Sequence, residues 1–96
     1  MKILAMEKEI PGRQPDAFAS HLKSEAMRVW SLYQSGVLRE FYFREDHSDA
    51  VLILECGSAA EAQQILDSLP LVQAGLIGFD IVPLIPYTGF ERLFTQ

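Results

Sequence analysis

Apolar and polar residues alternate along four short segments. In the stretches between the first and second segments and between the third and fourth, the apolar residues instead recur at helical spacing. The helical spacing predicts helices over 15–34 and 58–69, the second opened by a capping box of Ser58 and Glu61. The alternation predicts strands over 2–9, 37–44, 50–56 and 76–85. The order β-α-β-β-α-β is that of an α+β, ferredoxin-like fold with an antiparallel sheet.

Both faces of the predicted sheet carry apolar residues. In the third strand, Val51 and Ile53 point to one face, and Leu52 and Leu54 point to the other. In the second strand, strict alternation places on one face Val37, Phe41 and Phe43, and on the other Leu38 and Tyr42. Strands that are apolar on both faces are normally covered on both, whereas two helices cover only one. We therefore expect a homodimer of the dimeric αβ-barrel type, or a higher homo-oligomer.

The end of the chain carries two prolines and an aromatic segment. Because a proline cannot donate a hydrogen bond to a central ladder, Pro83 indicates a sheet edge or a bulge. Pro86 then begins a C-terminal arm over 86–96, which we expect to contact a neighbouring subunit; the alternative is an arm folded back on its own helices. With 96 residues in all, the chain is predicted to be a single domain, 1–96, that includes this arm.

Composition narrows the possible partners and location. The chain is 49% hydrophobic, and its mean hydropathy is +0.10. These are more apolar side chains than one small core is expected to need, which favours a contact surface. A net charge of −5 with only 8 Lys and Arg argues against nucleic acid. No apolar run approaches the ~18–20 residues of a membrane span, and Glu7 and Glu9 oppose a signal peptide. With a single Cys56, we expect a cytoplasmic protein with a reduced thiol and no membrane partner.

One acidic residue falls on the apolar face of the first predicted helix. At 100° per residue, Glu25 lies between Phe18 and Leu32, and His21 lies one turn earlier. A carboxylate among apolar side chains is costly unless paired, and its desolvation raises its pKa. Glu25 is therefore the predicted general base, with His21 as its partner. The alternative is an ion pair, or a carboxylate that reaches solvent at the helix edge.

Other side chains are candidates for substrate binding. Arg39 in the second strand could hold a carboxylate through its forked guanidinium, and Tyr42 follows on the opposite face; an ion pair with Glu40 is the alternative for the arginine. Trp30 is expected to point away from the apolar helix face, as a second contact patch or beneath the C-terminal arm. His47 lies in a turn where most histidines are solvated. Two histidines do not make a convincing metal site, so we expect neither a metal nor a cofactor.

Several stretches resemble muconolactone isomerases. They are "GVLREFYFREDH", "LKSEA", which is similar to the family's "LKADE", and "LPL" followed by a strand with Asp80 and then a proline. On this register Arg39 and His47 match positions that those enzymes fill with arginine and histidine. The spacing from "LKSEA" to Gly36 is one residue shorter than in the family. The resemblance implies a dimeric αβ-barrel and a proton transfer next to a lactone or enol carbonyl.

Three functions are therefore open. The first is a muconolactone isomerase-like enzyme with Glu25 as base, His21 or His47 tuning it, and Arg39 binding a substrate carboxylate. The second is a non-catalytic ligand-binding or assembly module, in which no cavity lies between helix and sheet. The third is a cofactor-independent monooxygenase, with Trp30, Tyr42 and Tyr87 lining a cleft for a polycyclic aromatic substrate. The same fold supports all three, so the choice depends on the site.

Overall fold

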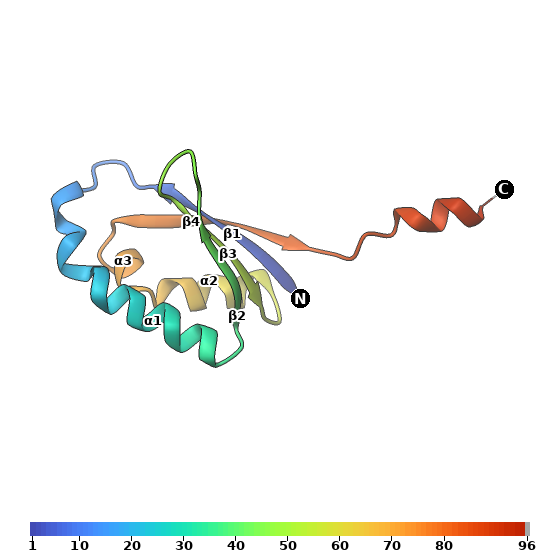
Figure 1. The fold of residues 1–96 in the computed structure, drawn as a ribbon, viewed down its shortest axis with the longest axis horizontal. Coiled ribbons are helices and arrows are strands. Elements are labelled where there is room, and N and C mark those ends of the chain that lie inside the picture. Colours follow the sequence, from blue (N-terminus) through green and yellow to red (C-terminus); the bar gives the residue numbers. More distant parts are fainter. Residues whose placement is uncertain (96) are drawn as a thin grey trace.

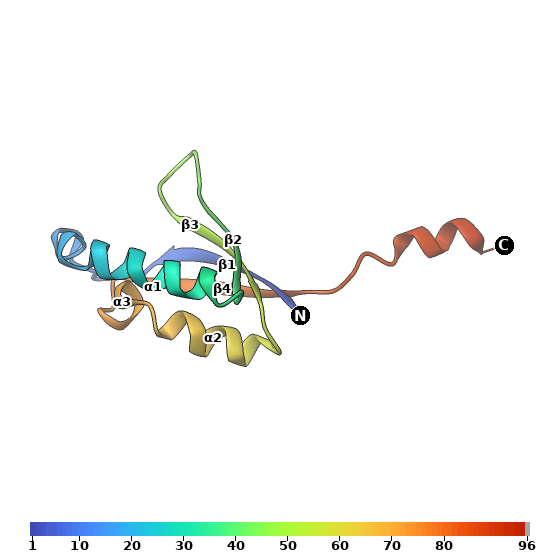
Figure 2. The ribbon, with the colours of Figure 1, turned by 60° about the horizontal axis from the view of Figure 1, so that its bottom comes forward.

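The computed structural model, which describes residues 1–95, contains one four-stranded antiparallel sheet with its helices on one face (Figures 1 and 2). The strands lie in the order β2-β3-β1-β4. The prediction of a ferredoxin-like fold is confirmed. The elements are β1 Lys2–Glu9, α1 Leu22–Gln34, β2 Leu38–Phe43, β3 Ala50–Glu55, α2 Ala59–Asp67, α3 Pro70–Gln73 and β4 Ile77–Leu84.

The first helix begins later than the sequence predicted. Residues Pro15–Ala17 and Ala19–His21 form two 3₁₀ turns, and α-helical geometry starts only at Leu22. A 3₁₀ turn has about three residues instead of 3.6, so a phase counted from Phe18 does not carry into the helix. The assignment of residues to faces of α1 has to start at Leu22.

The second predicted helix is followed at once by a separate short helix. Ser58 accepts a hydrogen bond from the Glu61 N–H at 3.1 Å, and the Glu61 carboxylate accepts one from the Gly57 N–H at 2.8 Å, which confirms the capping box. Helix α2 ends at Asp67, before Pro70 as predicted. The same proline then occupies the first turn of the short helix α3, where its missing N–H has no cost.

The second strand contains an irregularity that reverses part of the predicted facing. Leu38 pairs with Leu54 but Glu40 pairs with Ile53, so one extra residue, Arg39, interrupts the alternation. Leu38 and Phe41 therefore both lie on the helix-covered face, where Leu38 is 1% exposed and Phe41 is 44% exposed. The prediction that Leu38 faces away from Phe41 is wrong, because a bulge shifts every side chain on one side of it.

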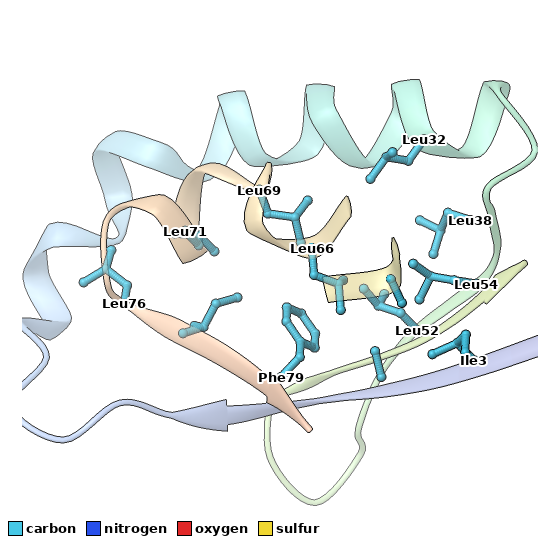
Figure 3. Close-up of a cluster of buried hydrophobic side chains, with 13 residues drawn as sticks. Ile3, Leu32, Leu38, Leu52, Leu54, Leu66, Leu69, Leu71, Leu76 and Phe79 are labelled. Carbon is cyan, nitrogen blue, oxygen red and sulfur yellow. The ribbon is translucent and has the colours of Figure 1, made fainter. Parts of the chain in front are cut away.

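The core lies between the sheet and the helices α2 and α3. Figure 3 shows Leu66 and Leu69 pointing from the helix layer toward the strands that carry Ile3, Leu54 and Phe79. Four of these five side chains are at most 1% exposed, and Phe79 is 7% exposed. Burying a leucine or isoleucine completely contributes roughly 1.5–3 kcal/mol, so this cluster supplies much of the stability.

The opposite face of the sheet and the C-terminal arm are uncovered by the chain itself. Strand β4 is an edge strand, as Pro83 indicated. Beyond it, residues 85–95 extend away from the domain and include a 3₁₀ helix, Gly89–Phe94 (Figures 1 and 2). Ile85 and Phe94 are 82% and 85% exposed, so the arm does not fold back onto the helices. Within residues 1–95, no helix is long and apolar enough to span a bilayer.

Candidate functional site

A cavity of about 600 Å³ lies between α1 and the helix-covered face of the sheet. Its helical wall is a single stripe with the spacing i, i+3, i+4, i+7, i+8 and i+11 counted from the first residue of α1. The stripe consists of Leu22, Glu25, Ala26, Val29, Trp30 and Tyr33. All six residues therefore project from one face of the helix toward the same space.

The sheet supplies the opposite wall. Phe41 and Phe43 of β2 face the cavity beside Ala50 of β3, and Phe79 of β4 also lines it. Alanines on both walls, Ala50 and Ala26, have only a methyl group, so helix and sheet do not fill the space between them. A cavity of this size is typical of a small-molecule site.

Glu25 is the carboxylate on the helical wall. Its Oε1 atom accepts a hydrogen bond from the backbone N–H of Leu71 in α3 at 2.9 Å. Burial raises the pKa of Glu25 above its ordinary value, and the hydrogen bond from Leu71 opposes this shift without cancelling it. Glu25 is therefore a carboxylate that binds a proton more readily than usual and that faces the cavity.

Glu7 is a second carboxylate in the cavity, and sequence reasoning missed it as a site residue. It follows the buried Ile3 and Ala5 at intervals of two residues, which places it on the same face of β1. Its Oε1 atom accepts a hydrogen bond from the Ala50 N–H at 3.0 Å. Burial raises the pKa of Glu7 and the nearby carboxylate of Asp49 raises it further, while the hydrogen bond from Ala50 and the charge of Arg13 oppose the shift without cancelling it. The signal was the strand alternation itself, which put an acid on the buried face.

His47 lies at a neighbouring depression that shares Glu7 with the cavity. Its Nε2 atom is 3.1 Å from Asp49 Oδ2, and its Nδ1 atom is 3.1 Å from Asp46 Oδ1. Because Asp49 also interacts with Glu7, a line of polar groups leads from His47 at the surface to the cavity. His47 itself does not line the cavity, so its connection to the site passes through Asp49.

His21 and Arg39 are outside the cavity lining. His21 is the N-cap residue of α1, but its side chain makes no capping hydrogen bond, and among the described residues Glu25 is hydrogen-bonded to Leu71. No hydrogen bond joins His21 to Glu25 in the described part of the chain, and His21 ends the 3₁₀ turn that precedes α1. The guanidinium of Arg39 donates to the carbonyl oxygen of Gly36, at the bulge.

The two aromatic candidates lie at the rim of the cavity. Trp30 contributes to the lining and its ring centroid is 5.8 Å from that of Tyr33, although the helix phase had placed it on the opposite side. Tyr42 also reaches the rim, but its hydroxyl donates to Glu40 Oε1 at 2.8 Å. The Glu40 carboxylate raises the pKa of Tyr42. Of the two, Trp30 is therefore the better candidate for contact with a ligand, because the Tyr42 hydroxyl is hydrogen-bonded to Glu40.

The fold has a counterpart among solved structures. No protein-family model matches the sequence, and no curated protein sequence matches it significantly. A structural match is 5-chloro-2-hydroxyhydroquinone dehydrochlorinase (TftG) from Burkholderia phenoliruptrix AC1100, in complex with 2,5-dihydroxybenzoquinone. The TM-score is 0.59 at 19% identity, over 93% of this chain and 98% of that chain. The match extends over most of both chains, and at this identity it shows the shared fold.

Proposed function

We propose that the protein is a small-molecule enzyme that moves a proton within a lactone or enol compound, as the resemblance to muconolactone isomerases implies. One observation carries this proposal: Glu25, with a raised pKa, faces a cavity of about 600 Å³ that holds a second carboxyl, Glu7. A base is most effective when its pKa lies near the working pH. The structural neighbour, whose name describes an enzyme acting on a substituted hydroquinone, supports small ring compounds as substrates.

The proposed step uses the two carboxyls in different protonation states. The Glu25 carboxylate removes a proton from the carbon next to the carbonyl group of a β,γ-unsaturated lactone, which gives a dienolate. When Glu7 holds a proton, it can donate a hydrogen bond to the oxygen that gains charge. The proton held by Glu25 is then delivered to the γ-carbon, so that the double bond moves into conjugation and no redox partner is needed. Positioned acid and base groups of this kind typically contribute ~10²–10⁴-fold to a rate.

Only one of the two histidines has a place in this scheme. His47 contacts Asp49, which in turn interacts with Glu7, so we propose that His47 influences the proton held by Glu7. His21 is not within the cavity lining and has no proposed role in the reaction.

The test is proton exchange on a neutral five-membered β,γ-unsaturated lactone in D₂O, followed by NMR. The wild type should accelerate deuterium incorporation at the α- and γ-carbons. Glu25→Gln should slow the exchange by ~10²-fold or more, because an amide cannot take the proton. Glu45→Gln, at an exposed turn position, removes the same charge outside the site and is the matched control.

Two results would contradict the proposal. If the wild type does not accelerate exchange above the rate with the control buffer, the cavity is not a proton-transfer site for lactones. If Glu25→Gln retains the wild-type rate, then Glu25 serves only to bind the Leu71 N–H, and a non-catalytic ligand-binding module becomes the better description.

We also propose that the open face of the sheet is covered by a second copy of the chain. Leu4 pairs with Ile53 on one side and with Val82 on the other, so these three side chains form an apolar row across the face. Val82 is 42% exposed in the single chain. The C-terminal arm carries further exposed apolar residues, and we propose that it also contacts another subunit.

A lysine on this face tests the assembly. Ile53→Lys would place a charge between two packed sheets, so sedimentation at micromolar concentration should show a dimer for the wild type and a monomer for the variant. Gln64→Lys, exposed on α2, should leave the dimer intact. A compact wild-type monomer would disprove the proposed assembly.

A further inference from the structure

The charges that face the cavity are of one sign. Among its lining residues in the described chain, the ionisable carboxyls are Glu7 and Glu25, and no lysine, arginine or histidine is present. The rest of the lining is apolar or aromatic, apart from hydroxyl groups such as those of Ser48 and Tyr33. A bound anion would therefore meet two carboxyls and no positive partner within the cavity.

The arginines nearest to this region are already engaged. Arg13 is 3.0 Å from Glu9 and donates to the Leu76 carbonyl oxygen at 3.3 Å, and its guanidinium lies over the Phe18 ring, 5.2 Å from the centroid. The Phe18 ring lines the cavity, whereas Arg13 lines only the neighbouring depression, from which its charge partly opposes the raised pKa of Glu7. A ligand could therefore bind the Arg13 guanidinium only if one of these existing contacts were broken.

Two further arginines are held at the surface. Arg44 makes two hydrogen bonds to Asp46, at 2.9 Å and 2.7 Å. Arg39, which the resemblance to muconolactone isomerases suggested as a carboxylate ligand, donates to Gly36 at the bulge and does not line the cavity. The cavity thus lacks the forked donor that recognises carboxylates elsewhere.

The aromatic rings give the cavity its shape. The centroid of the Tyr33 ring is 5.8 Å from that of Trp30 and 5.2 Å from that of Phe41, so Tyr33 joins the three rings of α1 and β2 in a row. Faces and edges of aromatic rings pack well against a planar, unsaturated ligand. The carboxyls deeper in the site can accept hydrogen bonds from a ligand hydroxyl and, when protonated, donate to a ligand carbonyl.

We infer that this cavity binds an electrically neutral, planar ring compound with a hydroxyl or carbonyl group, and that it discriminates against the same ring carrying a carboxylate. The inference rests on the proposed function in that it concerns the same cavity, but it requires only binding. If the inference holds, this cavity recognises its ligand differently from a site in which an arginine binds a carboxylate of the substrate.

A matched pair of ligands tests the inference. A butenolide with a carboxymethyl substituent and its methyl ester share the ring and nearly the same shape, but differ by one negative charge. Calorimetric titration of the full chain at pH 8 should give a dissociation constant at least about tenfold lower for the ester, since like charges in a partly desolvated site repel. Glu7→Gln combined with Glu25→Gln should reduce this ratio to about threefold or less, and Glu45→Gln should preserve it.

The outcomes distinguish this inference from the proposed function. Equal or tighter binding of the carboxylate by the wild type would overturn the inference, as would the absence of ester binding at millimolar concentration. If the ester is preferred but Glu25→Gln keeps full proton-exchange activity, the charge selection stands and the proposed reaction fails. If the carboxylate is preferred while Glu25→Gln abolishes exchange, the reaction stands and the charge selection fails.

Discussion

The two halves of the helix layer pack against the same sheet in different ways. On the α2 side, Ala62 and Leu66 are at most 1% exposed and contact a closely packed core. On the α1 side, only Leu32 of thirteen helical residues is buried, and six others line a cavity of about 600 Å³. The α2 half supplies packing energy, whereas the α1 half leaves space for a ligand. In a domain of this size, the closely packed half must compensate for the open one.

The largest predicted difference in the free energy of unfolding comes from truncating one leucine to alanine in each half. Leu66→Ala should lower the free energy of unfolding by about 2–5 kcal/mol, because Leu66 is 1% exposed and its loss leaves a cavity. Leu22→Ala removes the same atoms from a side chain that is 53% exposed at the cavity, and should cost less than about 1 kcal/mol. Urea denaturation followed by circular dichroism measures both. Equal losses would mean that the α1 half is packed in solution, and the comparison would fail.

A smaller effect should separate the starts of the two helices. Ser58→Ala removes the side-chain cap of α2 and should cost roughly 0.5–2 kcal/mol. His21→Ala at the corresponding position of α1 removes a side chain that makes no capping hydrogen bond, and should change stability by less than about 0.5 kcal/mol. Thermal unfolding of the two variants provides the measurement. A loss at His21 as large as that at Ser58 would contradict the described start of α1.

The smallest effect concerns pH. Because the pKa of Glu25 in the folded chain is raised above its ordinary 4.5, the folded state binds this proton more tightly than the unfolded state. The resulting stabilisation is complete below pH 4.5 and is lost as pH rises through the raised pKa. Glu25→Gln lacks this dependence, so its stability relative to the wild type should increase from pH 4 to pH 8. A difference that stays constant, measured by urea denaturation with Glu45→Gln as control, would show that burial does not perturb Glu25.

Much of the fold followed from local patterns, and part of the site did too. Alternation located the four strands, and the capping box located the start of α2. Glu25 was identified from its place on an apolar helix face, although the helix phase was counted from Phe18. Trp30 was misplaced because it lies about 80° around the helix axis from Leu22, at the margin of the apolar stripe, and it nevertheless lines the cavity. The bulge at Arg39 was missed because a single extra residue leaves no compositional mark.

The sequence by itself determined the elements, their order and the excess of apolar residues on the sheet. Only the tertiary structure decided which groups meet in the cavity. Glu25 binds a backbone N–H 46 residues away, and Glu7 binds one 43 residues away. Local spacing encodes which face of an element a residue occupies, whereas the distance between helix and sheet depends on all side chains packed between them. The cavity, its two carboxyls and the absence of a positive partner in its lining are therefore properties of the packed chain.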